Sequence, residues 1–164
     1  MMARTFLAFG GGVVLVVFML GVTTSAASGQ TPLPGRFEIR LLPGYTHEPL
    51  KGIDSIVGKI VKQDGLESLY EMGPIPKKGA PVEGGSFVNQ ALQLPEGKRL
   101  WLKEQTVGGR KFHVAYGKDQ RLRVSTTSAT QGVNFTAEAK TPADIADVLL
   151  MVLTFAEQEP KRDK

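Results

Sequence analysis

The second half of the chain contains two stretches in which apolar and polar residues alternate. Residues 121–127 place Leu122 and Val124 on the same side, and residues 132–140 alternate polar residues with the apolar set Val133, Phe135, Ala137 and Ala139. Successive side chains of a β-strand point to opposite faces, so this period of two predicts two strands. We expect one face of these strands to lie in a core and the other to meet water.

Similar but weaker patterns predict further strands upstream, at 36–42, 55–62, 66–72, 98–107 and 110–116. Asp64-Gly65 and Gly108-Gly109 have the composition of tight turns, so each is expected to close a hairpin. A two-residue turn at Gly108-Gly109 would set Trp101 opposite Tyr116 on the core side, and a three-residue turn would reverse that arrangement. Both faces of this strand are partly apolar, so the sequence leaves the register open.

The composition of three segments between these strands predicts their structure. Residues 45–54 are predicted to form a loop. Residues 73–85 hold three prolines and four glycines, which exclude a helix or a central strand there. Residues 86–94 are apolar enough to re-enter the fold, either as an edge strand or as a short helix.

The segment 141–157 is predicted to be the one long helix. Thr141 suits the N-cap because its hydroxyl can accept a hydrogen bond from a free amide of the first turn, and Pro142 is tolerated at the first helical position. Apolar residues recur with helical spacing and leave almost no polar side in the middle of the segment. The predicted fold class is therefore α+β: an antiparallel meander sheet of six or seven strands packed on one C-terminal helix, after an N-terminal signal segment.

Residues 1–29 have the features of a secretory signal peptide: Arg4 near the start, an apolar run over 6–22, and small residues over 23–29. An uncleaved anchor is the alternative, because the apolar run is just long enough for a thin bilayer. We expect a linker at residues 30–35, a single α+β domain at 36–158 and a charged tail at 159–164. The domain is expected to be exported, either periplasmic or secreted, and contact with the membrane is expected only through the N-terminal segment if it stays uncleaved.

The composition of the chain excludes several classes of function. The 164 residues are 41% hydrophobic and 22% charged, with 20 basic and 16 acidic side chains and a net charge of +4. This excess of basic over acidic side chains is too small and too dispersed to indicate a nucleic-acid partner. The absence of cysteine excludes disulfides and thiol chemistry, and the two histidines are too few for an all-histidine metal site. We expect no cofactor, no metal and a monomer.

Three segments carry a resemblance to known proteins: FEIRLLPGY at 37–45, GIDSIVGKIVKQDGLESLYEMG at 52–73 and TPADIADVLLMVLTF at 141–155. Together they resemble a group of small exported bacterial proteins of unknown function, which share the Gly-Ile-Asp-Ser segment and the closing Thr-Pro helix. More remotely, the overall plan is similar to the PsbP-like fold, an antiparallel sheet backed by helices. Neither resemblance implies an activity or a catalytic residue.

A few side chains are candidates for chemistry or binding. His47 and Asp54 share a predicted loop and, with a serine, would be the minimum set for a hydrolase, although a loop whose Asp54 satisfies local amides is the simpler interpretation. His113, together with Arg121 and Arg123, would form a basic patch for an acidic ligand if their faces coincide. Two further candidates are Lys77 and Lys78, an exposed charge pair on the proline-rich loop.

These observations indicate an exported non-catalytic domain, not an enzyme, that binds an unidentified protein or envelope component through the 73–85 loop or the polar face of the sheet. Small-molecule binding between helix and sheet is one alternative. A hydrolase using His47, Asp54 and a serine is the other.

Overall fold

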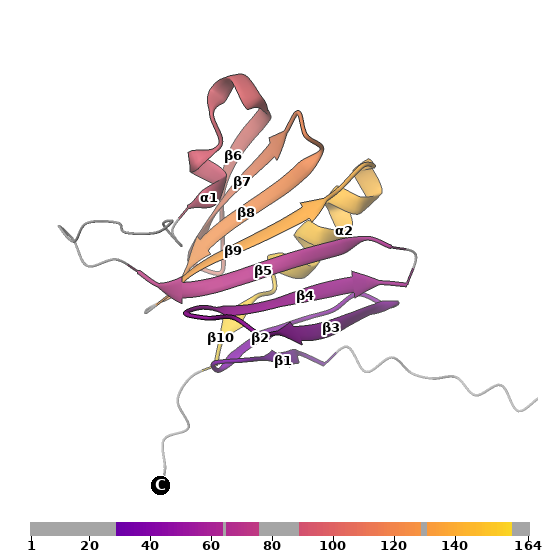
Figure 1. The fold of residues 1–164 in the computed structure, drawn as a ribbon, viewed down its shortest axis with the longest axis vertical. Coiled ribbons are helices and arrows are strands. Elements are labelled where there is room, and N and C mark those ends of the chain that lie inside the picture. The colour runs from indigo at the N-terminus through magenta and orange to yellow at the C-terminus, as the bar shows by residue number, and fades with distance from the viewer. Residues whose placement is uncertain (1–28, 64, 76–88, 129–130, 159–164) are drawn as a thin grey trace, which may run out of the picture.

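The structure is a computed structural model, and it describes residues 29–63, 65–75, 89–128 and 131–158. Seven strands form its main sheet: β3 (Tyr45–Leu50), β4 (Ile56–Lys62), β5 (Glu67–Pro74), β6 (Arg99–Val107), β7 (Arg110–Gly117), β8 (Arg121–Thr127) and β9 (Gln131–Glu138). The sheet is antiparallel throughout, in the order β3-β4-β5-β9-β8-β7-β6 (Figure 1).

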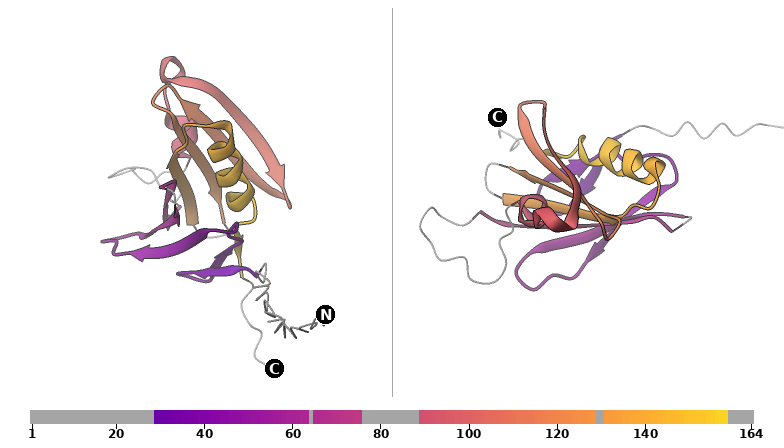
Figure 2. Two further views of the ribbon diagram at one scale, coloured as in Figure 1. Left: turned by 90° about the vertical axis from the view of Figure 1, so that its right-hand side faces the viewer. Right: turned by 90° about the horizontal axis from the view of Figure 1, so that it is seen from above.

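A smaller sheet and the helices complete the fold. The smaller sheet, in the order β1-β2-β10, consists of β1 (Thr31–Leu33), β2 (Phe37–Ile39) and β10 (Ala156–Glu157). The helical elements are α1 (Gln90–Gln93), the 3-10 turn η1 (Glu96–Lys98) and α2 (Pro142–Val152). Helix α2 lies across one face of the main sheet, here called the inner face, and the opposite face is called the outer face (Figure 2). The predicted α+β class, an antiparallel sheet packed on a C-terminal helix, is confirmed.

The order of the strands departs from a simple meander. Strands β3 to β5 form one meander and β6 to β9 form another, and the two are joined where β5 pairs with β9, with Tyr70 opposite Phe135 and Glu71 opposite Asn134. Strand β9, which is the last of the seven strands in the sequence, therefore lies at the centre of the sheet. Alternation within a strand shows which residues share a face but not which strands are neighbours, so the sequence could not reveal this crossover.

The core lies between the inner face, α2 and the smaller sheet. Val148, Met151 and Val152 of α2 are each 1% exposed or less. Phe155, just after the helix, stacks on Phe37 of β2 with ring centroids 5.3 Å apart and meets Phe135 of β9 edge-on at 5.6 Å. These aromatic contacts join the smaller sheet and the main sheet into one core.

Helix α2 begins where predicted and ends earlier. The Thr141 hydroxyl accepts from the Asp144 amide at 3.1 Å, and the Asp144 carboxylate accepts from the Thr141 amide at 2.9 Å, which forms a capping box. The predicted end at residue 157 is wrong, because the chain turns after Val152 and Ala156–Glu157 pairs with β2. Pairing with β2 satisfies the backbone of this segment in a strand rather than in further turns of helix.

The N-terminal part of the fold contains more strand than predicted. Thr31–Leu33, expected in a linker, forms β1 and pairs with β2. The first predicted strand, 36–42, is shorter, since only Phe37–Ile39 is in the sheet. Residues 45–50, predicted to be loop, form the edge strand β3 opposite β4. Pro32 and Pro49 argue against strands at these positions in the sequence. Strands β1 and β3, which contain them, are however edge strands, where proline is tolerated.

Both predicted hairpins are confirmed, and of the two turn lengths left open at Gly108-Gly109 the structure has the two-residue turn. Trp101 lies opposite Tyr116 with ring centroids 5.8 Å apart. Leu102 points to the outer face, where it packs on the small cluster formed by Ala91, Leu94 and Ala115. The described part of the 86–94 segment enters the fold through the short helix α1, which is one of the two alternatives left open for it.

Some predicted features lie outside the described residues: the signal segment apart from Gly29, the charged tail, and the 73–85 loop beyond Ile75. Within the described part of the chain, no helix is both long enough and apolar enough to cross a membrane.

Candidate binding surface

A row of polar side chains crosses the outer face. Its members occupy paired positions on five neighbouring strands, β5, β9, β8, β7 and β6, and in that order they are Glu71, Asn134, Ser125, His113 and Glu104. The sequence shows no sign of the row, because its members are brought into line only by the register of the strands.

Helix α1 covers the middle of this row. The Asn134 side-chain oxygen accepts from the Gln90 amide at 3.1 Å and from the Ser125 hydroxyl at 2.7 Å, while the Ser125 oxygen accepts from the Ala91 amide at 2.9 Å. The sheet thereby caps the first turn of α1, whose own N-cap residue makes no side-chain capping bond. The expectation that the outer face of β8 and β9 meets water is wrong here, since Ser125 is fully buried and Asn134 is 3% exposed.

The three residues of the proposed basic patch do share the outer face, but two of them are in contact with acidic side chains. His113 Nε2 lies 3.1 Å from Glu104 Oε2, and an Arg123 nitrogen lies 2.6 Å from Asp119 Oδ2. Hydrogen bonds from Arg123 hold the pKa of Asp119 at about 2. Arg121 is exposed and sits opposite Glu138 across the strands. The result is a surface of paired charges rather than a continuous basic patch.

Arg121 and Arg123 belong to different hollows of the outer face. Arg121 lines a cleft of about 530 Å³ at the β4–β5 turn, together with Leu66, Glu67, Leu69, Thr136 and Lys140. Arg123 lines a second hollow of about 660 Å³, which we call the turn pocket. The turn pocket is lined by Leu94, Pro95 and Lys98 from the segment after α1, and by Lys118, Asp119 and Arg123 from the β7–β8 turn and β8.

Apolar side chains are exposed on the outer face of β3, β4 and β5. We call this the outer patch, and it consists of Leu50, Val57, Val61 and Leu69, arranged around Lys59. Leu50 and Leu69 are 45% and 46% exposed, and both valines are half-buried. Lys59 lies 3.1 Å from Glu67 and 3.3 Å from Glu48, and the hydrogen bonds that Lys59 donates to these carboxylates raise its pKa.

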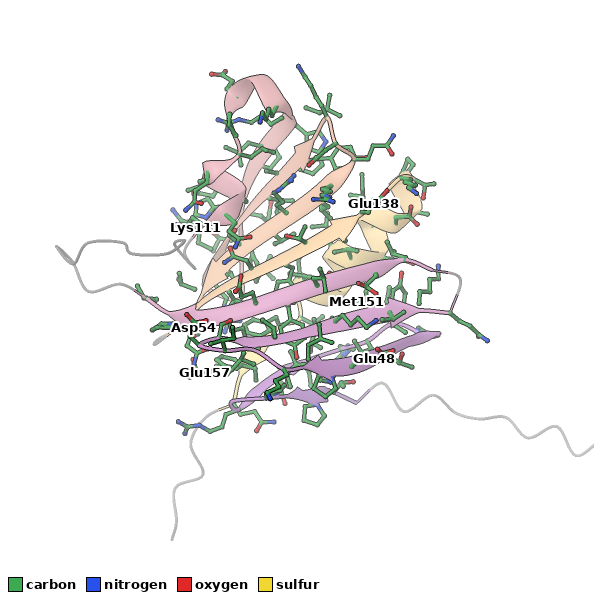
Figure 3. All side chains as sticks on the ribbon, viewed as in Figure 1. Glu48, Asp54, Lys111, Glu138, Met151 and Glu157 are labelled. Carbon is green, nitrogen blue, oxygen red and sulfur yellow. The ribbon has the colours of Figure 1, made fainter. Side chains whose placement is uncertain are left out.

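The hydrolase site that the sequence offered as an alternative is not assembled among the residues that the structure describes. His47 Nε2 is hydrogen-bonded to Tyr70 Oη at 2.7 Å, and Ser55 donates to Glu71 at 3.2 Å. Asp54 lies in the connection beyond Leu50, and Leu50 is itself three residues, or about 10 Å of strand, away from His47. Figure 3 likewise places Glu48, the neighbour of His47, far along the hairpin from Asp54. No nucleophile is therefore held against a base among these three residues.

Lys77 and Lys78 lie outside the described residues, so their predicted role stays a prediction. In the part of the chain that the structure describes, no group of three or more histidines, aspartates or glutamates is placed to hold a metal ion.

Comparison with known proteins identifies no family. No protein-family model matches the chain, and no curated protein matches its sequence. A solution structure of cyanobacterial PsbP (CyanoP) from Synechocystis sp. PCC 6803 is similar with a TM-score of 0.48 and 13% identity, over 75% of this chain and 87% of that one. This is a remote likeness of fold. The closer resemblance to small exported bacterial proteins stays a prediction.

Proposed function

We propose that this chain is an exported, non-catalytic domain that binds a protein partner through the outer patch. The observation that supports the proposal most directly is the exposure of Leu50 and Leu69 on one sheet face, side by side with an ordered ion pair network. Apolar side chains gathered in this way on a folded surface are typical of protein interaction sites.

The charges within the patch favour a protein over a lipid surface. Glu48 and Glu67 both lie beside Lys59, so the patch contains more acidic than basic side chains. An anionic membrane surface would repel these carboxylates. A protein interface, by contrast, combines an apolar centre with a polar rim.

The non-catalytic part of the proposal is based on how the titratable side chains are used. His47 is bound by Tyr70, and burial raises the pKa of Tyr70 to about 12, so this tyrosine remains neutral and is a poor nucleophile near pH 7. His113 is bound by Glu104, and the carboxylate of Asp119 is occupied by Arg123. Export is inferred from the sequence of residues 1–29.

Packing counts against the small-molecule alternative. The helix residues that face the sheet, Val148, Met151 and Val152, are each 1% exposed or less, and Phe135 beneath them is equally buried. An interface packed in this way leaves no room for a ligand between helix and sheet.

The proposal can be tested by site-specific photo-crosslinking in intact cells. A photoreactive phenylalanine analogue at Leu69 is expected to form a discrete adduct with a protein partner, and a second one at Leu50 is expected to trap the same protein. Leu150 is the matched control, because it is an apolar residue of similar exposure, 58%, on the solvent side of α2.

The charge variant Leu69→Asp provides the second arm. It should abolish the adduct formed from position 50 while leaving the melting temperature close to that of the unmodified chain, since an exposed substitution changes stability little. Adducts formed equally well from Leu150, or unaffected by Leu69→Asp, would contradict the proposed surface.

A further inference from the structure

The turn pocket combines unpaired positive charge with a rigid frame. Lys98 and Lys118 line it, both are exposed, and neither has a carboxylate within ion-pair distance in the described part of the chain. The Lys118 amide donates to the Lys98 carbonyl at 2.8 Å, so the two backbones are held together at the mouth of the pocket.

The wall opposite Lys98 is fixed by the turn between β7 and β8. Asp119 accepts two hydrogen bonds from the Arg123 guanidinium, at 2.6 and 3.2 Å, and a third from the Arg121 amide at 3.2 Å. The pair lies directly over Gly117, where an added Cβ would come within 2.2 Å of Asp119 Oδ1 and 3.0 Å of an Arg123 nitrogen. Glycine at position 117 is thus what allows this ion pair to line the pocket.

The residues that line the turn pocket carry a net positive charge. Asp119 is the acidic residue among them, and Arg123 already neutralises it, so both lysines remain as excess positive charge. Leu94 and Pro95 supply an apolar wall.

We propose that the turn pocket is a binding site for a phosphate monoester, with Lys98 and Lys118 contacting the phosphate and Leu94 and Pro95 contacting the organic part. Lysine ammonium groups bind phosphate as compact point charges, and the two lysines are the cations left for this role because the guanidinium of Arg123 is hydrogen-bonded to Asp119. A volume of about 660 Å³ is within the range of small-molecule sites.

The two sources of such a phosphate, a soluble metabolite and a lipid headgroup, can be separated in one titration. The backbone amide signals of the full-length exported chain are followed by NMR while inorganic phosphate or glycerol 3-phosphate is added at constant ionic strength. We expect saturable shifts at Lys98, Lys118 and Leu94, with glycerol 3-phosphate binding more tightly than inorganic phosphate. If phosphatidylglycerol vesicles displace glycerol 3-phosphate and phosphatidylcholine vesicles do not, the site binds a lipid headgroup. If neither kind of vesicle displaces glycerol 3-phosphate, the site binds a soluble ligand.

Two variants of pocket residues with opposite expected effects, together with a control pair outside the pocket, make the test specific. The double variant Lys98→Gln/Lys118→Gln should weaken glycerol 3-phosphate binding about tenfold, whereas the matched pair Lys51→Gln/Lys103→Gln, also exposed but outside the pocket, should leave it unchanged. Asp119→Asn keeps an acceptor for the Arg121 amide but removes the negative charge, so binding should become about two- to fivefold tighter.

The absence of shifts at millimolar ligand, or an equal loss in both lysine pairs, would overturn the proposal, because the lysines would then act only through general charge. An unchanged affinity in Asp119→Asn would also overturn it. The turn pocket and the outer patch lie on different strands, so failure of one proposal does not decide the other.

Discussion

Tyr70 and His47 are hydrogen-bonded across β4, with Tyr70 Oη 2.7 Å from His47 Nε2. Tyr70 lies on β5 and His47 on β3, two strands apart. The contact is possible because the intervening residue is Gly58, over which the tyrosine ring lies: a Cβ at this position would come within 2.3 Å of Tyr70 Oη and 2.5 Å of its Cζ. The bond ties the edge strand β3 to the centre of the sheet.

The first prediction concerns this glycine. Gly58→Ala should destabilise the domain by about 1–3 kcal/mol, because Tyr70 is 2% exposed and has no room to move away from the added methyl group. Gly97→Ala is the matched control, since nothing lies within 4 Å of a Cβ added there. Urea unfolding measures both. Equal effects in the two variants would show that the close approach to Tyr70 is not what makes Gly58 necessary.

The second prediction concerns pH. Burial lowers the pKa of His47 below its ordinary value of 6.5, so in the folded state the ring binds a proton less readily than in the unfolded chain. Between pH 6.5 and the lower folded pKa the unfolded state therefore holds more protons, and the free energy of unfolding should fall as the pH decreases through this window. Asp119, with a pKa of about 2, contributes only at more acidic pH, below its ordinary value of 3.8.

The His47→Gln variant separates this effect from other titrations. Melting temperatures measured at pH 7.5 and pH 5.5 should differ less in the variant than in the unmodified chain, because glutamine does not titrate. A difference of the same size in both proteins would assign the pH dependence to other groups.

The third prediction concerns the hydrogen bonds beneath α1. Ser125→Ala removes the acceptor of the Ala91 amide and one of the donors to Asn134, all in a buried setting, so we expect a cost of about 1–3 kcal/mol. Amide hydrogen exchange should accelerate at Ala91 more than in β9. Because α1 leads into the wall of the turn pocket, this variant should also weaken glycerol 3-phosphate binding. Unchanged protection at Ala91 would show that packing alone holds α1 on the sheet.

The fourth prediction concerns the attachment of α2 to the edge of the main sheet. Asp147 accepts from Tyr45 Oη at 2.8 Å and from Lys62 Nζ at 3.3 Å, and Lys62 lies 5.6 Å from the centre of the Tyr45 ring. Tyr45→Phe should cost about 1 kcal/mol. In a double-mutant cycle with Asp147→Ala, the two effects should be less than additive, because both substitutions remove the hydrogen bond between Tyr45 and Asp147. Strict additivity in urea unfolding would mean that the contact does not contribute to stability.

Several elements could be predicted from the sequence because their causes are local. The N-cap at Thr141 and the tight turn at Gly108-Gly109 depend on residues a few positions apart. Alternation along β8 and β9 identified the buried side chains Val124 and Phe135, because the period of a strand is a property of the chain itself.

The candidate sites could not be predicted in the same way. Arg121 and Arg123 were recognised as candidates, but their separation into two hollows follows from the strands and turns beside them. Lys98 and Lys118 meet only because β6 and β7 form a hairpin, so residues 20 positions apart come to share one pocket mouth. No sequence pattern around either lysine indicated a binding site.

The sequence by itself determined the class of the fold, the start of the closing helix and the faces of the central strands, since these depend on short-range periodicity and capping. Only the tertiary structure decided that β5 adjoins β9, that β3 is a strand rather than a loop, and that α1 covers Ser125 and Asn134. The physical reason is that burial and hydrogen bonding of an edge strand or a short helix depend on partners far away in the chain, and an amino-acid pattern contains no record of which distant segment will supply them.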